Sequence, residues 1–288
     1  MNKLNYPQLD SFLRAALDED IGTGDITTLA CISESDVSKG VFIAKESGVL
    51  SGLDVLKRVF ELLDKSVSVT TLVNDGDSVY EGDVIAEISG SSRSILTGER
   101  TALNLLQHMS GIATRTAEAV REVSGSKTKI LDTRKTTPGM RALDKYAVIC
   151  GGGKNHRFNL ADAVLIKDNH IKAAGGITNA VEKVRLMNTE GRFSFVHVPH
   201  LPIEVETENL LQVEEALDAG ADIIMLDNMS LEMMAEAVLL VDGRALTEAS
   251  GNMGERDLGA IAETGVDYIS IGALTHSVKA LDISLKFE

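Results

Sequence analysis

Hydrophobic and polar positions alternate in regular blocks over the second half of this chain. From about Ile130, six short apolar runs each end in a polar or glycine-containing signature: KILDTRKT, AVLIKDNH, IEVETEN, IIMLDNM, ALTEASGN and YISIGALTH. The stretches NLLQVEEALDAG, LEMMAEAVLLV and RDLGAIAETG between them have helical periodicity, and two of these end in glycine. The signatures at Glu206, Asp227, Ser250 and Gly272 are 21, 23 and 22 residues apart. This regularity predicts repeated strand–helix units, which build either a doubly wound parallel sheet or a closed barrel.

The first part of the chain, to about Thr114, has a mixed pattern. An opening helix is predicted by the spacing of Leu9, Phe12, Leu13, Ala16 and Leu17. The segment VNDGDSVYEGDVIAEISG alternates apolar residues between Gly and Asp, which predicts a β-hairpin. The segment TGERTALNLLQHMSGIATRTAEAVREV carries apolar residues at helical spacing, so we expect a long buried helix that leads into the second part.

The last residues of the six apolar runs are the strongest candidates for function. In both architectures the ligand binds beyond the carboxyl ends of the strands. The residues at those ends are Arg134 and Lys135, Lys167 and Asp168, Glu206, Asp227, Ser250 to Asn252, and Gly272. The early ends are cationic and the later ones anionic or rich in glycine, so one edge would hold both an anion cradle and a pair of carboxylates.

Composition and charge narrow the class of ligand. The chain has 288 residues, 44% of them hydrophobic, and a net charge of −15, which argues against wrapping nucleic acid. From Thr133 to Lys172, however, eight Lys and Arg face three Asp, a local charge of +5. We find neither an apolar export segment nor a membrane-spanning run, so we expect a cytoplasmic protein. Cys31 and Cys150 are interpreted as small core residues rather than nucleophiles.

The cationic cluster consists of Arg134, Lys135, Arg157 and Lys167. Guanidinium groups pair with carboxylate or phosphate through two hydrogen bonds, whereas lysine supplies a mobile point charge. Both types together indicate a ligand with more than one anionic group. A solvated basic face is the alternative interpretation.

The carboxylates Glu206 and Asp227 end neighbouring runs and call for different chemistry. They suit Mg²⁺ or sugar hydroxyls, and they could stabilise positive charge on a ribose carbon. Glu204 lies two residues from Glu206 and shares its strand face. The alternative is a buried carboxylate satisfied by the backbone or by a lysine. A zinc site at His197 and His200 is rejected, because the HVPH segment lacks a zincin glutamate.

Taken together, the motifs resemble the quinolinate phosphoribosyltransferase family over essentially the whole chain. The matching segments are EDIGTGDITT, ERTALNLLQHMSGIAT, DTRKTTPGMR, GGGKNHRFNL, IKDNH, IEVETEN, MLDN, EASGN and GVDYISIGALTHSVKALDISL. The resemblance implies an N-terminal α/β sandwich domain over residues 1–114. An open α/β barrel of the type II phosphoribosyltransferase kind would follow over residues 115–288, with the tail from about residue 275 packing back on the first domain.

The resemblance also implies a reaction and roles for individual residues. Quinolinate and 5-phosphoribosyl-1-pyrophosphate would give nicotinate mononucleotide, pyrophosphate and CO₂, with Mg²⁺, in NAD biosynthesis. Lys135, Glu206 and Asp227 would be catalytic, the two carboxylates lying at the ribose and metal end. The dicarboxylate would be held by Thr133, Arg134, Lys135, His156, Arg157 and Lys167, with Arg100 contributed across a homodimer interface, in a dimer or a hexamer built as a trimer of dimers. Phosphate would lie against Ser250, Gly251, Asn252, Ser270, Ile271 and Gly272.

The sequence departs from the family pattern at two places, and three other functions are alternatives. Thr207 stands where a second valine is more usual, and the loop NTEGRFSFVHVPHLP is longer than typical. The rivals are the phosphoribosyltransferase-like group found beside molybdate transport genes, a barrel aldolase with a Schiff base on Lys167, and a non-enzymatic anion-binding regulator. The joint presence of Arg134, His156 and Arg157 favours the quinolinate enzyme.

Overall fold

The computed structural model describes residues 4, 6–189 and 201–288, which form two compact units. The first unit holds the chain up to Glu118 together with Thr137–Gly152 and Ser277–Glu288. The second holds Ala119–Thr136 and Gly153–His276. Within the described ranges, no helix combines the length and apolar character needed to cross a membrane.

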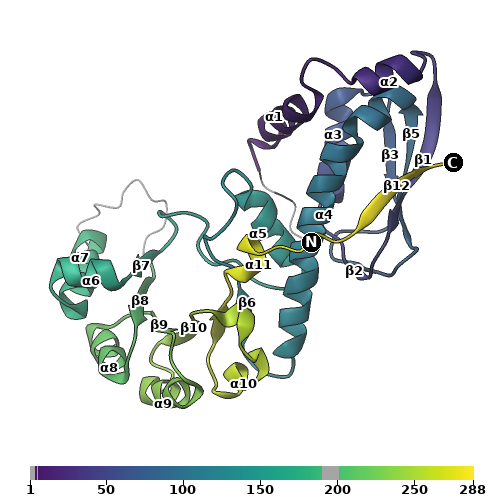
Figure 1. The fold of residues 1–288 in the computed structure, drawn as a ribbon. Helices are drawn as coiled ribbons and strands as arrows, with labels where there is room; N and C mark the ends of the chain where they lie inside the picture. The colour runs from purple at the N-terminus through teal and green to yellow at the C-terminus, as the bar shows by residue number, and fades with distance from the viewer. Residues whose placement is uncertain (1–3, 5, 190–200) are drawn as a thin grey trace. The chain divides into compact units, whose positions relative to one another are not determined.

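The first unit is built on a four-stranded antiparallel sheet. Its strand order is β12-β1-β5-β3, so the C-terminal strand pairs with the first one (Figure 1). The strands of this sheet are β1 (Val37–Ala44), β3 (Ser68–Thr71), β5 (Val84–Ser91) and β12 (Ile283–Phe287). A separate antiparallel pair joins β2 (Gly48–Val49) to β4 (Ser78–Val79).

Four helices pack on this sheet through one apolar core: α1 (Leu9–Ile21), α3 (Leu53–Leu63), α4 (Ser92–Glu122) and α5 (Arg141–Cys150), of which α4 continues into the second unit. The short α2 (Ile26–Cys31) contributes no residue to this core. Asp75 accepts the N–H groups of Gly52 and Leu53, at 3.0 Å each, and so satisfies the start of α3. The predicted opening helix and the predicted long buried helix are both confirmed, as α1 and α4.

Two expectations for the first unit are wrong. The segment predicted as a hairpin contributes β4 and β5, but β4 pairs with β2, and β5 pairs with β1 and β3. A turn closed by the Asp83 N–H and the Tyr80 carbonyl, 3.0 Å apart, separates the two strands without pairing them. Cys31 is exposed at the end of α2 rather than in the core, and Cys150 is half-buried.

The second unit is a six-stranded parallel sheet in the order β6-β11-β10-β9-β8-β7. Its strands are β6 (Lys129–Leu131), β7 (Val164–Ile166), β8 (Ile203–Thr207), β9 (Ile223–Asp227), β10 (Leu246–Ser250) and β11 (Tyr268–Ser270). Its helices are α6 (Asp168–Ala174), α7 (Ile177–Thr189), α8 (Leu210–Ala219), α9 (Leu231–Val241), α10 (Leu258–Glu263) and α11 (Ala273–His276), with a 3₁₀ turn at Met253–Glu255. The predicted strand–helix repeats are therefore confirmed.

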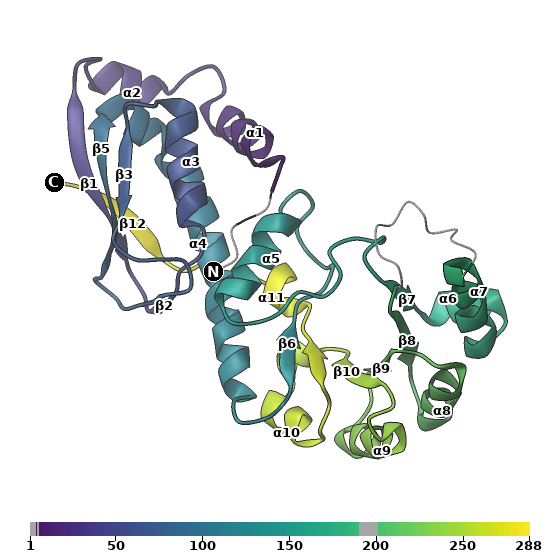
Figure 2. The ribbon, with the colours of Figure 1, turned by 180° about the vertical axis from the view of Figure 1, so that it is seen from behind.

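The sheet of the second unit is curved and open. Helices α8, α9 and α10 lie along the outer side of the curve in both views (Figures 1 and 2). Because β6 and β7 are edge strands and do not pair with each other, the sheet is an open barrel rather than a closed one. The fold class predicted from the family resemblance is thus confirmed.

Side-chain alternation gives the two faces of this sheet opposite character. Val205, Ile224, Leu226, Ala249 and Ile269 are buried in the apolar core that includes the outer helices. Their strand neighbours point to the other face, because successive side chains of a strand alternate. The polar residues on that inner face are Glu204, Glu206, Asp227, Glu248, Ser250 and Ser270. A parallel sheet with acids on its inner face requires a ligand or internal pairing there, since buried charge is costly when it is uncompensated.

Candidate active site

All but one of the predicted site residues belong to the second unit. Because its six strands are parallel, their carboxyl ends meet at one edge of the sheet. The residues at or just beyond those ends are Thr133 to Lys135 after β6, Lys167 after β7, Glu206 in β8, Asp227 in β9, Ser250 to Asn252 after β10, and Ser270 to Gly272 after β11. Arg100 is the exception, since it is an exposed residue of α4 in the first unit.

Two guanidinium groups lie near enough to influence each other at this edge. Arg157 is half-buried in the segment before β7, and its Nη1 donates a hydrogen bond to the Ala163 carbonyl at 3.0 Å. Burial lowers the pKa of Arg157, and the positive charge of Arg134 lowers it further, while Glu204 and Asp162 act in the opposite direction. Two like charges held close together in a partly buried position indicate a binding site for an anion.

Lys135 is fixed by its backbone while its side chain remains exposed. Its N–H donates to Thr133 Oγ1 at 3.0 Å, and its carbonyl accepts from Thr275 Oγ1 at 2.9 Å. A Cβ atom on Gly272 would lie 2.9 Å from the Lys135 Cδ atom. Glycine at the end of β11 therefore gives the lysine stem room to pass.

Lys167 and Glu206 form an ion pair across the ends of β7 and β8. The Lys167 Nζ atom lies 2.7 Å from Glu206 Oε2, with 46% and 14% of the two side chains exposed. This contact agrees with the alternative of a carboxylate satisfied by a lysine. It also places Lys167 and Glu206, one cationic and one anionic residue that are both predicted to bind substrate, side by side. The unusual Thr207 is buried and donates to the Met225 carbonyl at 2.8 Å, so its hydroxyl is accommodated away from this pair.

Asp227 is oriented by the residue that follows it. Asn228 has a φ of 55°, and its Nδ2 donates to Asp227 Oδ2 at 2.7 Å. The Asn228 N–H donates to the Ser250 carbonyl at 2.9 Å, and a Cβ on Gly251 would lie only 2.2 Å from Asn228 Oδ1. The turn at Ser250 to Asn252 is thus packed against Asn228. The carboxylates of Glu206 and Asp227 are hard oxygen ligands, which fits Mg²⁺ bound mainly through substrate and water.

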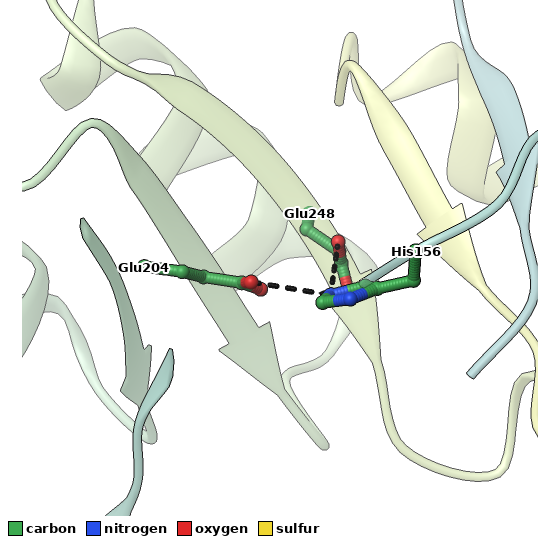
Figure 3. Close-up of side chains that lie close together, drawn as sticks. All are labelled: His156, Glu204 and Glu248. Carbon is green, nitrogen blue, oxygen red and sulfur yellow. Dashed lines mark ion pairs between the residues drawn. The ribbon is translucent and has the colours of Figure 1, made fainter. Parts of the chain in front are cut away.

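His156 lies between two glutamates from different strands (Figure 3). Its Nε2 atom is 3.1 Å from Glu204 Oε2 of β8 and 3.6 Å from Glu248 Oε2 of β10. Its Nδ1 atom accepts the backbone N–H of Arg157 at 2.8 Å, and its own backbone N–H donates to Asp132 Oδ1 at 2.8 Å. The ring of His156 therefore contacts side chains of β8 and β10, and its backbone is bound to Asp132, the residue that follows β6.

The pKa of Glu248 in this cluster is unusual for a carboxylate. Burial raises the pKa of Glu248 to about 8, and the charge of Glu204 raises it as well. His156, a hydrogen bond from Ser270 and the charge of Lys167 oppose this rise. Glu248 therefore holds a proton more readily than an exposed glutamate does.

Three residues at this edge were not singled out from the sequence. Asp132 and Asn228 lie inside the quoted motifs, and Glu248 is the acid of EASGN. An acid in the middle of an apolar strand, at the alternation position of the inner face, was the available signal for Glu248. The side chain of Ile271 lies in the apolar core, and its N–H donates to the Leu131 carbonyl. His197 and His200 lie outside the described residues, as does most of the long loop before β8.

Comparison with known proteins gives matches along the whole chain. The profile described as "Quinolinate phosphoribosyl transferase, N-terminal domain" matches residues 25–110, and that of the C-terminal domain matches residues 112–286. The probable nicotinate-nucleotide pyrophosphorylase [carboxylating] of Bacillus subtilis is 46% identical over 282 residues, covering 98% of this chain and 94% of the relative.

Solved structures give the same result. The nicotinate-nucleotide pyrophosphorylase of Francisella tularensis aligns with a TM-score of 0.92 at 43% identity, and NadC of Streptococcus pyogenes with a TM-score of 0.90 at 46% identity. In each case the alignment covers 100% of both chains. The chain belongs to the quinolinate phosphoribosyltransferase family, as its motifs predict.

Proposed function

We propose that this protein transfers the phosphoribosyl group of 5-phosphoribosyl-1-pyrophosphate to quinolinate and removes one carboxyl group, which gives nicotinate mononucleotide, pyrophosphate and CO₂. This reaction would supply NAD biosynthesis. Family membership over both domains supports the proposal. The observation that carries it at the site is the edge where Arg134, Arg157 and Lys167 lie with Glu206 and Asp227, since the two substrates need opposite charges.

The cationic residues bind quinolinate. Its two adjacent carboxylates match the two guanidinium groups, because each carboxylate can accept a pair of N–H donors. Lys135, Lys167 and Thr133 complete this end beside His156, whose two ring nitrogens contact Arg157, Glu204 and Glu248, and Arg100 comes from a second copy of the chain. Bringing in a dianion would also relieve the mutual repulsion of Arg134 and Arg157, which appears in the lowered pKa of Arg157.

The ion pair of Lys167 and Glu206 suggests an order of binding. The Lys167 ammonium is 2.7 Å from Glu206 Oε2. A quinolinate carboxylate competes for this ammonium, and Glu206 is then available to the ribose. The dicarboxylate would therefore bind first and prepare the site for the second substrate.

The carboxylates stabilise the ribose at the moment of transfer. The ring nitrogen of quinolinate is a poor nucleophile, so the reaction needs an aligned pair of substrates and a ribosyl carbon with partial positive charge. Glu206 and Asp227 provide the negative field for that carbon, and Asn228 holds Asp227 in place. Mg²⁺, held by pyrophosphate with Glu206 and Asp227, would neutralise the leaving group. Phosphate oxygens would lie against the turns at Ser250 to Asn252 and at Ser270 to Gly272.

Loss of CO₂ follows from the new bond. Once the ring nitrogen carries the ribose it is positively charged, and it stabilises the electron pair that remains at the neighbouring carbon when the carboxylate leaves. A proton then replaces the carboxylate. This step requires no further cofactor.

The assembly and the location belong to the same proposal. We propose a homodimer, or a hexamer built from three dimers, because the quinolinate end includes Arg100 of another copy. We also propose that the protein acts in the cytoplasm.

The proposal is tested by a turnover assay with purified protein. Quinolinate labelled in the carboxyl group next to the ring nitrogen, phosphoribosyl pyrophosphate and Mg²⁺ should yield labelled CO₂ and nicotinate mononucleotide in equal amounts. Nicotinate should react poorly, because it lacks one of the two carboxylates. Binding of quinolinate without turnover would indicate a regulator, and borohydride trapping on Lys167 with a carbonyl substrate would indicate an aldolase; either result would refute the proposal.

A further inference from the structure

His156, Glu204 and Glu248 form a cluster of titratable side chains at the inner face of the sheet. Glu204 is 3% exposed and Glu248 is 1% exposed, and both approach the same atom, His156 Nε2. The second oxygen of each carboxylate, Oε1, is buried without a hydrogen-bond partner among the described residues. Two ionised carboxylates in this position would repel each other in a place with little solvent to screen them.

A positive charge or a proton is therefore required between the two carboxylates. The hydrogen bond made by the other ring nitrogen of His156, Nδ1, distinguishes these two possibilities. The Nδ1 atom of His156 accepts the Arg157 N–H at 2.8 Å, so Nδ1 carries no hydrogen. A neutral imidazole then carries its hydrogen on Nε2, which donates toward Glu204 and Glu248. A metal ion on Nε2 would require a hydrogen on Nδ1, and that hydrogen would collide with the Arg157 N–H. The same contact excludes a doubly protonated ring in this arrangement.

The remaining charges around Glu248 do not replace the missing proton. The groups that face it are Glu204 of β8, His156 of the segment before β7, Ser270 of β11 and Lys167 after β7. The Lys167 ammonium is 46% exposed and already bound to Glu206. Arg157 is a further cation near the cluster, but its charge acts on Glu204 rather than on Glu248. With the imidazole neutral, we therefore assign the proton of the cluster to Glu248. Glu248 is the one with the longer contact to His156, and its pKa is raised to about 8.

We propose that Glu248 is a positioning residue for the quinolinate end of the site, and that it fixes His156 and Arg157 as a neutral carboxylic acid. This inference rests on the proposed function. Arg157 follows His156 directly, and its backbone N–H depends on the orientation of the imidazole. Ionisation of Glu248 releases its proton to solvent and leaves an additional anion beside the dianion site, which weakens the binding of a dicarboxylate.

The expected consequence is a loss of quinolinate affinity above neutral pH that depends on Glu248. At about one pH unit above its pKa, roughly one molecule in eleven retains the proton, so the Kd should rise about tenfold between about pH 6.5 and about pH 9. Quinolinate itself stays a dianion over this range. Glu248→Gln keeps the shape of the neutral acid and cannot ionise. The ratio of the two Kd values should therefore fall from about tenfold to about twofold or less in this variant.

The experiment is calorimetric titration of full-length protein with quinolinate at both pH values. Glu236→Gln, on the exposed side of α9, is the matched control and should keep the wild-type ratio. An unchanged ratio in Glu248→Gln would overturn the inference. A wild-type Kd that does not rise with pH would also overturn it.

Two further measurements on the wild-type protein keep the inference testable if Glu248→Gln does not fold. Nitrogen NMR at about pH 7 should show His156 as the neutral form with its hydrogen on Nε2. A charged ring, a hydrogen on Nδ1, or a stoichiometric metal ion that is lost in His156→Gln would overturn the inference. The turnover assay separates the two claims, because failure to form nicotinate mononucleotide refutes the proposed function, whereas unchanged pH dependence in a turning-over enzyme refutes only the role of Glu248.

Discussion

Replacing Arg157 with alanine is the most informative perturbation of the cationic end. Arg157 is half-buried, and burial and then the charge of Arg134 lower its pKa, so an anion beside its guanidinium group is favourable. Truncating one partner of a buried charge pair costs about 2 to 5 kcal/mol. Partial exposure and relief of the repulsion with Arg134 favour the lower part of this range, about 2 to 3 kcal/mol. The Kd for quinolinate should therefore rise by about 30- to 150-fold.

Calorimetry measures this Kd directly, and two variants control for other effects. Arg157→Lys keeps the charge but loses the planar pair of donors, so it should recover part of the affinity. Arg244 donates to the Leu240 carbonyl at 2.9 Å, much as Arg157 donates to Ala163, but it lies just before β10 starts, at the opposite edge of the sheet. Arg244→Ala should leave quinolinate binding unchanged. Affinity in Arg157→Ala within about twofold of wild type would refute the assignment of Arg157 to the dicarboxylate.

Three further predictions concern the acidic end and the strand ends. Glu206→Ala should lower kcat by about 100-fold or more while changing the quinolinate Kd far less, because the carboxylate acts on the ribose; a larger effect on quinolinate affinity would reverse the roles. Gly251→Ala should lower the free energy of unfolding, measured by chemical denaturation, by about 2 kcal/mol or more, because a Cβ at this φ of 96° would lie 2.2 Å from Asn228 Oδ1. The control Gly243→Ala, at a φ of 71° and with open space around it, should cost about 1 kcal/mol. Equal costs in the two variants would contradict the clash at Gly251. The folded state keeps the Glu248 proton up to about pH 8, whereas the unfolded chain releases it near the ordinary glutamate pKa. This group therefore lowers the free energy of unfolding as pH rises between these two values, by at most about 1.4 kcal/mol per pH unit. The free energy of unfolding of Glu248→Gln relative to wild type should increase over the same range.

The repeated strands could be predicted because their signal is local. Each run of the second unit is apolar on the face toward the helices, and each ends in a residue that cannot remain in a core, such as Asp227. The parallel arrangement then brings the ends to one edge without further information. The hairpin in the first unit could not be predicted correctly, because alternation identifies a strand but does not name its partner. The pairing of β5 with β1 joins residues 41 to 54 positions apart in sequence, from Ile43 with Val84 to Val37 with Ser91.

The sequence could propose residues for the candidate site but not the contacts among them. Strand ends and charge pointed to Arg157, Lys167 and Glu206, but the pairing of Lys167 with Glu206 depends on the adjacency of β7 and β8. The partners of His156 come from strands far apart in sequence, and Glu248 gives no charge signal of its own in an acidic protein. Burial, which converts Glu248 from an ordinary acid into one that holds a proton, is a property of the folded sheet.

A crystal structure with quinolinate bound tests the central claim most directly, since the account requires one edge of one sheet to have opposite charges at its two ends. Both carboxylates of the ligand should lie within hydrogen-bonding distance of the guanidinium groups of Arg134 and Arg157, with the ring nitrogen directed toward Glu206 and Asp227. Quinolinate bound away from these arginines, or with its ring nitrogen directed away from the two carboxylates, would contradict the account.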